Sequence, residues 1–154
     1  MTAPTGRVMG LDIGDRTIGI AISDPGWIIA TGVTTVRRTR PADDLEALRA
    51  LVEAHEITRL VVGWPLRLDG QPGEQTRKVG VLARAIREAL GLPVERMDER
   101  LTTVAAERAL REGGVHGRER RQVVDQVAAT LILQGWLDRR QARRRRAEED
   151  GAAG

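Results

Sequence analysis

The sequence contains no cysteine and only two histidines, His55 and His116, among its 154 residues. The absence of cysteine excludes disulfides, thiolate metal sites and cysteine nucleophiles, and it agrees with a cytoplasmic location. A zinc site built from imidazoles is not expected with so few histidines. Any metal cofactor would therefore have oxygen ligands, which favours Mg²⁺ or Mn²⁺.

Long apolar runs are also absent. No stretch approaches the ~20 apolar residues of a membrane-spanning helix, and residues 1–7 lack the apolar core of a signal peptide. We therefore expect a cytoplasmic protein with no membrane partner. The length corresponds to about one domain, and no internal repeat is visible.

The net charge of +3 comes from one end of the chain. Six arginines follow residue 138, at positions 139, 140 and 143–146, whereas the preceding residues carry 19 basic and 19 acidic groups. We interpret residues 1–138 as the folded domain and residues 139–154 as an arginine-rich, flexible tail. Such a run is usually a solvated helix end or a disordered segment, and its functional alternative is attraction to nucleic-acid phosphates.

Residues 8–24 have the pattern of a β-hairpin, because two β-branched apolar runs flank a polar corner at residues 14–17. Asp12 interrupts the first run between Leu11 and Ile13. A carboxylate at the end of an apolar strand loses hydration, and it recovers that free energy only with a cation or with hydrogen-bond donors. Asp12 is therefore the first candidate for chemistry.

Further elements follow from the periodicity of apolar residues and from glycine and proline positions. We expect a strand over 27–36, a helix from Pro41, a buried strand over 60–63, a loop over 65–73, a helix over 74–90, a strand over 92–98, a helix over 104–111, a polar loop over 116–121 and a last helix over 122–140. Short turns make the first three strands antiparallel, and helical crossovers make the later strands parallel. This order predicts an α/β, ribonuclease H-like fold, with a mixed five-stranded sheet (three antiparallel strands plus two parallel) and helices on both faces.

Acidic residues are predicted to meet beyond the carboxyl ends of the strands, where open α/β sheets bind ligands. Asp12 ends the first strand, Asp98 and Glu99 follow the fifth, and Asp125 lies on the apolar stripe of the last helix. Carboxylates that converge in this way repel one another unless a cation lies between them. Carboxylate-bound Mg²⁺ or Mn²⁺ is typical of sites for in-line phosphoryl displacement.

Each acid also has a purely structural alternative. Asp12 has the surroundings of a hydrogen-bonded turn residue, Asp98 or Glu99 would suit the cap of the following helix, and Asp125 would suit an N-cap within a broken helix. Three further acids are interpreted as turn or strand-end residues: Asp15, Asp24 and Asp69.

Four segments together resemble the YqgF family (also called RuvX) of Holliday junction resolvases and pre-16S rRNA nucleases. They are residues 10–24, residues 61–70, the Asp-Glu-Arg-Leu-Thr-Thr run at 98–103, and the Asp-x-x-Ala-Ala-x-Leu-Ile-Leu-Gln run at 125–134. The resemblance implies a ribonuclease H-like, metal-dependent nuclease in which Asp12, Glu99 and Asp125 bind the metal and form the catalytic triad. It thus selects Glu99 where the pattern alone left Asp98 and Glu99 undecided. Trp64 replaces a smaller aliphatic residue, which we expect to change the loop surface and not the chemistry.

This hypothesis assigns a nucleic acid as the partner, either structured DNA or precursor rRNA. The residues expected to contact its phosphates are Arg16, Arg100, Thr102, Thr103, Arg118, Arg120 and Arg121. A four-way junction calls for two active sites and hence a homodimer, whereas trimming of a precursor rRNA end needs only a monomer. The pattern does not decide between these substrates.

Two other functions share parts of the pattern. One is a non-catalytic RNA-binding factor in ribosome assembly, in which the acids are vestigial. The other is an actin-like or sugar-kinase-like ATP-binding domain, because residues 12–17 resemble the phosphate loop of those proteins. That fold needs two such domains to enclose a nucleotide, and this chain has the length of one.

Overall fold

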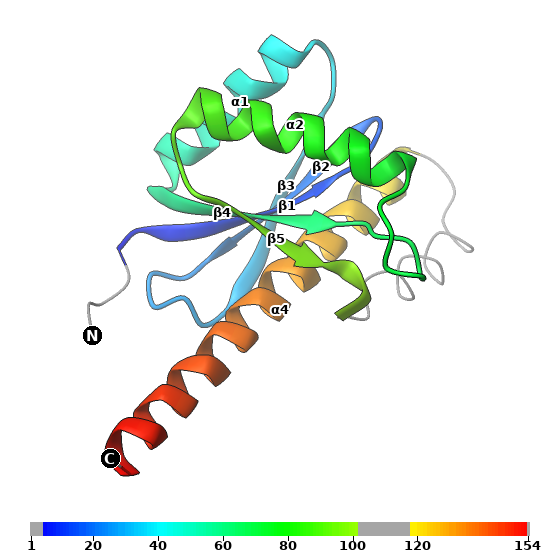
Figure 1. The fold of residues 1–154 in the computed structure, drawn as a ribbon. Coiled ribbons are helices and arrows are strands. Elements are labelled where there is room, and N and C mark those ends of the chain that lie inside the picture. The colour runs from blue at the N-terminus through cyan, green and yellow to red at the C-terminus, as the bar shows by residue number, and fades with distance from the viewer. Residues whose placement is uncertain (1–4, 102–117, 154) are drawn as a thin grey trace.

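The computed structural model describes residues 5–101 and 118–153. A five-stranded sheet lies between two helices on one face and one long helix on the other (Figure 1). The elements are β1 (Arg7–Ile13), β2 (Thr17–Ser23), β3 (Ala30–Arg37), α1 (Pro41–Ala54), β4 (Ile57–Trp64), α2 (Glu74–Leu90), β5 (Val94–Asp98), the short 3₁₀ helix η1 (Glu99–Leu101) and α4 (Arg118–Ala153). None of the described helices is long and apolar enough to cross a membrane.

The strands are ordered β3-β2-β1-β4-β5 in the sheet. The pairs β1–β2 and β2–β3 are antiparallel, and the pairs β1–β4 and β4–β5 are parallel. This confirms the predicted mixed sheet. Because β1 and β4 are central and covered on both faces, their sequences are nearly continuous apolar runs.

Two hydrophobic clusters fill the two faces of the sheet. On the side of α1 and α2, Leu11, Ile13 and Leu60 pack against residues such as Leu48 and Ile86. On the side of α4, a second cluster joins the sheet to the helix through Val8, Val61, Met97, Ala129, Ile132 and Leu133. Side chains alternate between the two faces along a strand. Leu11 and Ile13 point to the face of α1 and α2. Asp12, which lies between them in the sequence, therefore points to the α4 face.

Helix α2 has the bounds predicted from the sequence. At its start, the Thr76 hydroxyl accepts the Gly73 N–H at 3.1 Å and donates to the Pro65 carbonyl at 2.5 Å. At its end, Gly91 has a left-handed backbone with φ of 66°, which glycine adopts without steric cost. The hydrogen bonds of Thr76 fix the position of the loop that follows β4 against the start of α2.

Several predicted boundaries are wrong. The third strand begins at Ala30 and not at residue 27, and the fifth begins at Val94 and not at residue 92. Residues 118–121, predicted to be part of a polar loop, form the start of α4, and α4 ends at Ala153 instead of 140. The helix continues because residues 139–150 are rich in the strong helix formers alanine, arginine, glutamine and glutamate. The predicted helix over 104–111 lies outside the described residues.

The arginine-rich segment is therefore helical over residues 139–153, where we expected a flexible tail. Its first turn still contacts the body of the protein, because the Arg140 guanidinium lies 4.5 Å from the centre of the Trp27 ring. The centre of the Trp27 ring lies 5.9 Å from the centre of the Trp136 ring, and Trp136 belongs to α4, as Arg140 does. The remaining turns extend away from the sheet (Figure 1). Independent motion of these turns stays a prediction.

Candidate active site

Asp12 lies near the carboxyl end of β1 on the α4 face, and only 3% of its surface is exposed. Across the antiparallel pair it lies opposite Gly19 of β2. In the parallel pair of β1 and β4, Leu11 lies beside Val62. The next residue on each strand follows the same register, so Gly63 of β4 lies next to Asp12. The strand positions on both sides of this carboxylate therefore have no side chain.

Glu99 reaches the same place from the end of β5. It is the first residue of η1 and is 9% exposed. A Cβ atom placed on Gly63 would lie 2.8 Å from the Glu99 carboxylate oxygen Oε1, so this carboxylate lies directly over Gly63. The absence of a side chain at Gly63 thus makes room for the carboxylate beside Asp12.

Asp125 is brought to the sheet by α4. A Cβ atom placed on Gly19 would lie 2.1 Å from the Asp125 backbone carbonyl oxygen, so the helix backbone is in direct contact with β2 opposite Asp12. The side chain of Asp125 is half-buried and accepts a hydrogen bond from the Thr17 hydroxyl. Because α4 already begins at Arg118, Asp125 lies within the helix and is not its N-cap.

The three acids thus come from three elements, β1, η1 and α4, and lie near two glycines, Gly19 and Gly63. Burying two carboxylates, Asp12 and Glu99, costs hydration that a cation or donors must offset. Both carboxylates have interaction partners in the protein. Among residues 5–101 and the described side chains of α4, no three acidic or histidine side chains are arranged so that they could hold a metal ion. The donor chemistry fits Mg²⁺ or Mn²⁺, but the described positions do not form a cage of three ligands.

Asp98, the alternative to Glu99, has a different partner. It accepts the Arg100 backbone N–H at 2.9 Å, and its carboxylate forms an ion pair of 2.7 Å with the Arg100 guanidinium. The hydrogen bond from the Arg100 side chain lowers the pKa of Asp98, and the same bond raises the pKa of Arg100. Asp98 therefore stabilises the turn after β5. The helix that it was expected to cap, over residues 104–111, lies outside the described residues.

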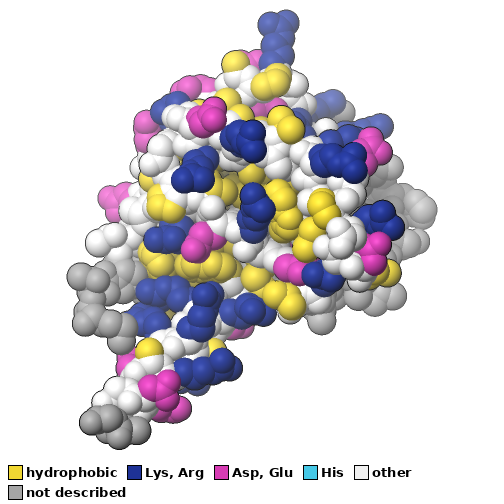
Figure 2. Space-filling view, in the orientation of Figure 1, with side chains coloured by type: hydrophobic (Ala, Val, Ile, Leu, Met, Phe, Trp, Pro, Cys, Tyr) yellow, Lys and Arg dark blue, Asp and Glu magenta, His cyan; other side chains and the backbone are white. Residues whose placement is uncertain are grey.

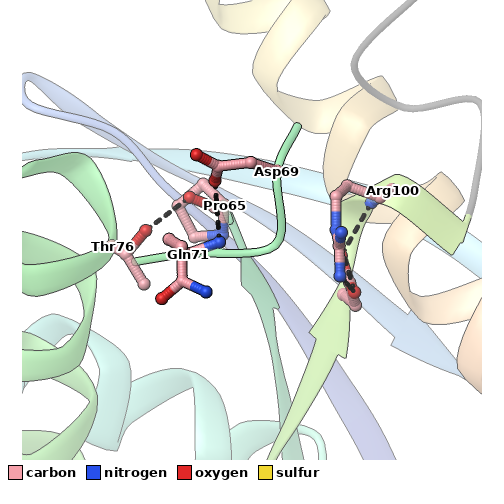
Figure 3. A network of polar contacts seen from close by, with 6 residues as sticks. Pro65, Asp69, Gln71, Thr76 and Arg100 are labelled. Carbon is pink, nitrogen blue, oxygen red and sulfur yellow. Dashed lines mark hydrogen bonds and ion pairs between the residues drawn. The ribbon is translucent and has the colours of Figure 1, made fainter. Parts of the chain in front are cut away.

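Of the residues expected to bind substrate, Arg16 and Arg100 have described side chains. Arg16 is exposed at the hairpin corner, and Arg100 is held by Asp98 close to the loop after β4, near Gly70 (Figure 3). The backbone of Arg118, Arg120 and Arg121 lies in the first turns of α4, but their side chains are outside the described part. Thr102 and Thr103 also lie outside the described residues.

The predicted turn acids have the expected roles. Asp24 accepts the backbone N–H groups of Gly26, Ile28 and Ile29, which closes the loop between β2 and β3. Asp69 accepts the Gln71 N–H at 2.9 Å within the loop after β4 (Figure 3). Asp15 forms an exposed ion pair with Lys78.

Comparison with known proteins identifies the family of this chain. The model of the RuvX family, described as Holliday junction resolvase, matches residues 6–139. The chain belongs to the RuvX family. A relative from Moorella thermoacetica, whose name marks it as a candidate pre-16S rRNA nuclease, is 54% identical over 134 residues, which cover 86% of this chain and 95% of the relative. A relative from Myxococcus xanthus with the same name is 50% identical over 132 residues, covering 86% and 87% of the two chains.

A solved structure, RuvC of Thermus thermophilus in complex with a Holliday junction substrate, superimposes with a TM-score of 0.55. It covers 85% of this chain and 94% of that chain, at 15% sequence identity. This likeness concerns the fold and confirms the ribonuclease H-like architecture predicted from the order of elements. The RuvX match ends at residue 139, so the distal turns of α4 lie beyond it.

Thr17, which contacts the candidate site through Asp125, was not singled out from the sequence. Its hydroxyl binds Asp125, but a threonine at a hairpin corner is typical of turns and carries no obvious functional signal. The alternation of side chains along β2 was the available clue that Thr17 faces α4. Thr17 shares a face with Gly19 and Ala21, and Ala21 packs in the cluster under α4.

Proposed function

We propose that this RuvX-family protein is a Mg²⁺- or Mn²⁺-dependent nuclease that hydrolyses phosphodiester bonds in structured nucleic acid. The observation that carries the proposal is the placement of two buried carboxylates at Gly63: Asp12 lies on the neighbouring strand, and Glu99 lies over Gly63. Such a pair is costly in a protein that only needs to fold, and it suits a site that binds a cation when substrate arrives.

Asp12 and Glu99 would hold the metal, and Asp125 would complete the acidic triad from α4. When bound, the metal supplies an activated water and stabilises the developing charge on the leaving oxygen. The residues of the chain position these acids: the hairpin holds Asp12 at the sheet end, and the Thr17 hydroxyl restrains Asp125.

Precursor 16S rRNA is the substrate that the relatives at 54% and 50% identity favour. Resolution of Holliday junctions is the second candidate, favoured by the family description and by the fold shared with RuvC. The two differ in symmetry, because a four-way junction needs two sites in a dimer whereas rRNA trimming needs one.

A cleavage panel tests the proposal. Purified protein would be incubated with a precursor 16S rRNA fragment, a four-way DNA junction and single-stranded DNA, each with Mg²⁺, with Mn²⁺ or with chelator. We expect cleavage that depends on metal and falls at least about 100-fold in Asp12→Asn. Asp43→Asn is the matched control, because Asp43 is an exposed acid in the first turn of α1.

Full cleavage by Asp12→Asn would overturn the proposal. A non-catalytic RNA-binding protein would bind the rRNA fragment without cutting it under any metal condition. Calorimetric titration of Mn²⁺ into wild type and Asp125→Asn separates the two cases, because an intact site binds the ion and loses affinity in the variant.

A further inference from the structure

A groove lies between α2 and the edge strand β5, and its end at Trp64 is next to the candidate site. Its volume is about 470 Å³, which is in the range of ligand-binding sites. Four arginines line it, three from α2 and one from β5: Arg77, Arg84, Arg87 and Arg96. Figure 2 shows this face of the molecule, where Lys and Arg side chains border a hydrophobic surface.

These four arginines have no acidic partner in the part of the chain that the structure describes. Five other described arginines each pair with a carboxylate, namely Arg38, Arg49, Arg59, Arg67 and Arg100. Arg37 and Arg40 do not form an ion pair with a described residue either, so the distinguishing feature of the four is that they line one groove. Among the residues that the structure describes, none that lines the groove is acidic. Since residues 1–138 are neutral in sum, this is a local concentration of positive charge and does not reflect a generally basic protein.

Trp64 organises one wall of the groove. The guanidinium of Arg96 lies 4.1 Å from the centre of the Trp64 ring, in the geometry of a cation–π contact. The far edge of the indole packs against α2, because a Cβ atom on Gly80 would lie 3.2 Å from it. The ring therefore holds Arg96 at the groove, and Arg96 as a whole is exposed.

The groove begins beside the candidate active site. Trp64 directly follows Gly63, and Gly63 lies against the Glu99 carboxylate. Pro72 and Thr76, which also line the groove, belong to the loop and helix start that follow β4. A nucleic-acid strand that passes over the ends of β4 and β5 would thus enter the groove directly.

We propose that this groove binds the phosphodiester backbone of the substrate beside the bond that is cut; the proposal rests on the nuclease function proposed above. Planar guanidinium groups bind phosphate oxygens in pairs, and four unpaired arginines match several consecutive phosphates. A symmetric dimer through this face would place the same four positive charges against each other, which disfavours a second copy of the chain as the occupant.

Binding measurements without cleavage test the proposal. The full chain would be titrated, in chelator, into a fluorescein-labelled precursor rRNA fragment with a single-stranded arm, and the dissociation constant measured by anisotropy at several salt concentrations. In Arg84→Gln/Arg96→Gln we expect about tenfold weaker binding and a salt slope smaller by roughly 1.4, because two phosphate contacts to a single strand are lost. Trp64→Phe should keep most of the affinity, and Trp64→Leu should lose part of it.

Arg37→Gln/Arg40→Gln is the matched control. It removes the same charge from exposed positions at the opposite edge of the sheet, at the end of β3 and the start of α1. An equal loss of affinity in this control would overturn the proposal, as would an unchanged dissociation constant and salt slope in the groove variant. Thermal unfolding confirms that each variant is folded. If Arg84→Gln/Arg96→Gln does not fold, Arg77→Gln/Arg87→Gln replaces it as the groove variant.

Two further arms complete the test. Inorganic phosphate and a mononucleotide are added as competitors, and displacement of the RNA by either at micromolar concentration would assign the groove to a small anion and overturn the proposal. Asp43→Asn, which changes an exposed acid away from both sites, should bind RNA with wild-type affinity. If neither the wild type nor any variant cleaves RNA, the proposed nuclease function fails. The groove assignment still stands in that case if the groove variant binds RNA more weakly than the wild type.

Discussion

The Thr17 hydroxyl donates a hydrogen bond to the Asp125 carboxylate and so connects the hairpin to the long helix α4. The two residues are 108 positions apart in the sequence. Thr17 is the first residue of β2, and its backbone carbonyl also accepts the Gly14 N–H at 2.9 Å, which closes the hairpin corner. The corner that follows Asp12 thus restrains a second acid of the site.

Replacing Thr17 with valine should separate the side-chain hydrogen bond to Asp125 from the backbone hydrogen bond that closes the hairpin corner. Valine keeps the shape of threonine but removes the donor, and a hydrogen bond to a charged group contributes about 1.5–3 kcal/mol. We expect Thr17→Val to lower the unfolding free energy by about 1–2 kcal/mol, because the site is partly exposed, and to slow cleavage. Urea unfolding and cleavage rates measure both, and Thr17→Ser should restore them. Equal behaviour of the valine and serine variants would contradict this role.

Gly19 sets the closest approach of α4 to the sheet. In Gly19→Ala the new methyl group would meet the Asp125 carbonyl oxygen at 2.1 Å, and helix backbone cannot rotate away as a side chain can. We expect a loss of about 1–3 kcal/mol or more in urea unfolding, together with reduced activity. Gly151→Ala is the control, since nothing lies within 4 Å of its Cβ position and alanine is favoured in helices. A neutral Gly19→Ala would show that α4 can shift freely.

Asp44 is a buried acid that supports the hairpin from α1. It is 2% exposed, accepts the Thr39 N–H at 2.9 Å and lies 3.5 Å from the Arg38 guanidinium. Arg38 in turn donates to the Gly14 carbonyl at 2.9 Å. We expect Asp44→Ala to cost about 2–3 kcal/mol in urea unfolding, because it leaves a backbone donor and a cation without their partner.

The adjacent Asp43→Ala provides the comparison for Asp44. Asp43 is exposed in the same helical turn, so its replacement should change the unfolding free energy by less than about 0.5 kcal/mol. Similar losses in both variants would mean that helix N-terminal charge, and not burial, explains the effect.

Acidification should weaken the fold through Asp24. Burial raises the pKa of this carboxyl, but the N–H groups of Ile29, Ile28 and Gly26 outweigh burial and hold the pKa below its ordinary value of 3.8. A lowered pKa in the folded state contributes stability above the unfolded pKa, and this stability is lost as the pH falls through the folded pKa. Asp98 acts in the same direction.

Urea unfolding between pH 7 and pH 3 checks this dependence. The unfolding free energy should decrease below about pH 4, and Asp24→Asn should show a smaller decrease because its side chain no longer titrates. An identical pH profile for wild type and Asp24→Asn would contradict the assignment.

Elements that depend on local pattern could be predicted from the sequence. Helix α2 has the predicted bounds because its apolar stripe and Gly91 act locally. The start of β3 could not be predicted in this way. The run Trp27 to Ala30 has the composition of a strand, but the Asp24 carboxylate binds its N–H groups and Trp27 adopts a positive φ of 59°.

The site was predicted as a set of residues and not as a geometry. Asp12 and Asp125 could be singled out as candidates because a charge on an apolar stripe is visible in the pattern. The choice of Glu99 over Asp98 required the family resemblance, since the two have the same charge; in the structure Glu99 is buried against Gly63, whereas Asp98 is paired with Arg100. The contact of Thr17 with Asp125 and the groove beside Trp64 depend on how separate elements pack, which no local pattern records.

Gly19 and Gly63 also have a consequence for how this family varies. A side chain at Gly19 would meet the backbone of α4, and one at Gly63 would meet the Glu99 carboxylate, so a substitution that harms packing there would also displace an acid of the candidate site. If the proposed function holds, one substitution at either position would alter stability and activity together. Sequence drift should therefore concentrate in the edge strands and the outer turns of α4, and substrate preference would diverge there while the chemistry stays fixed.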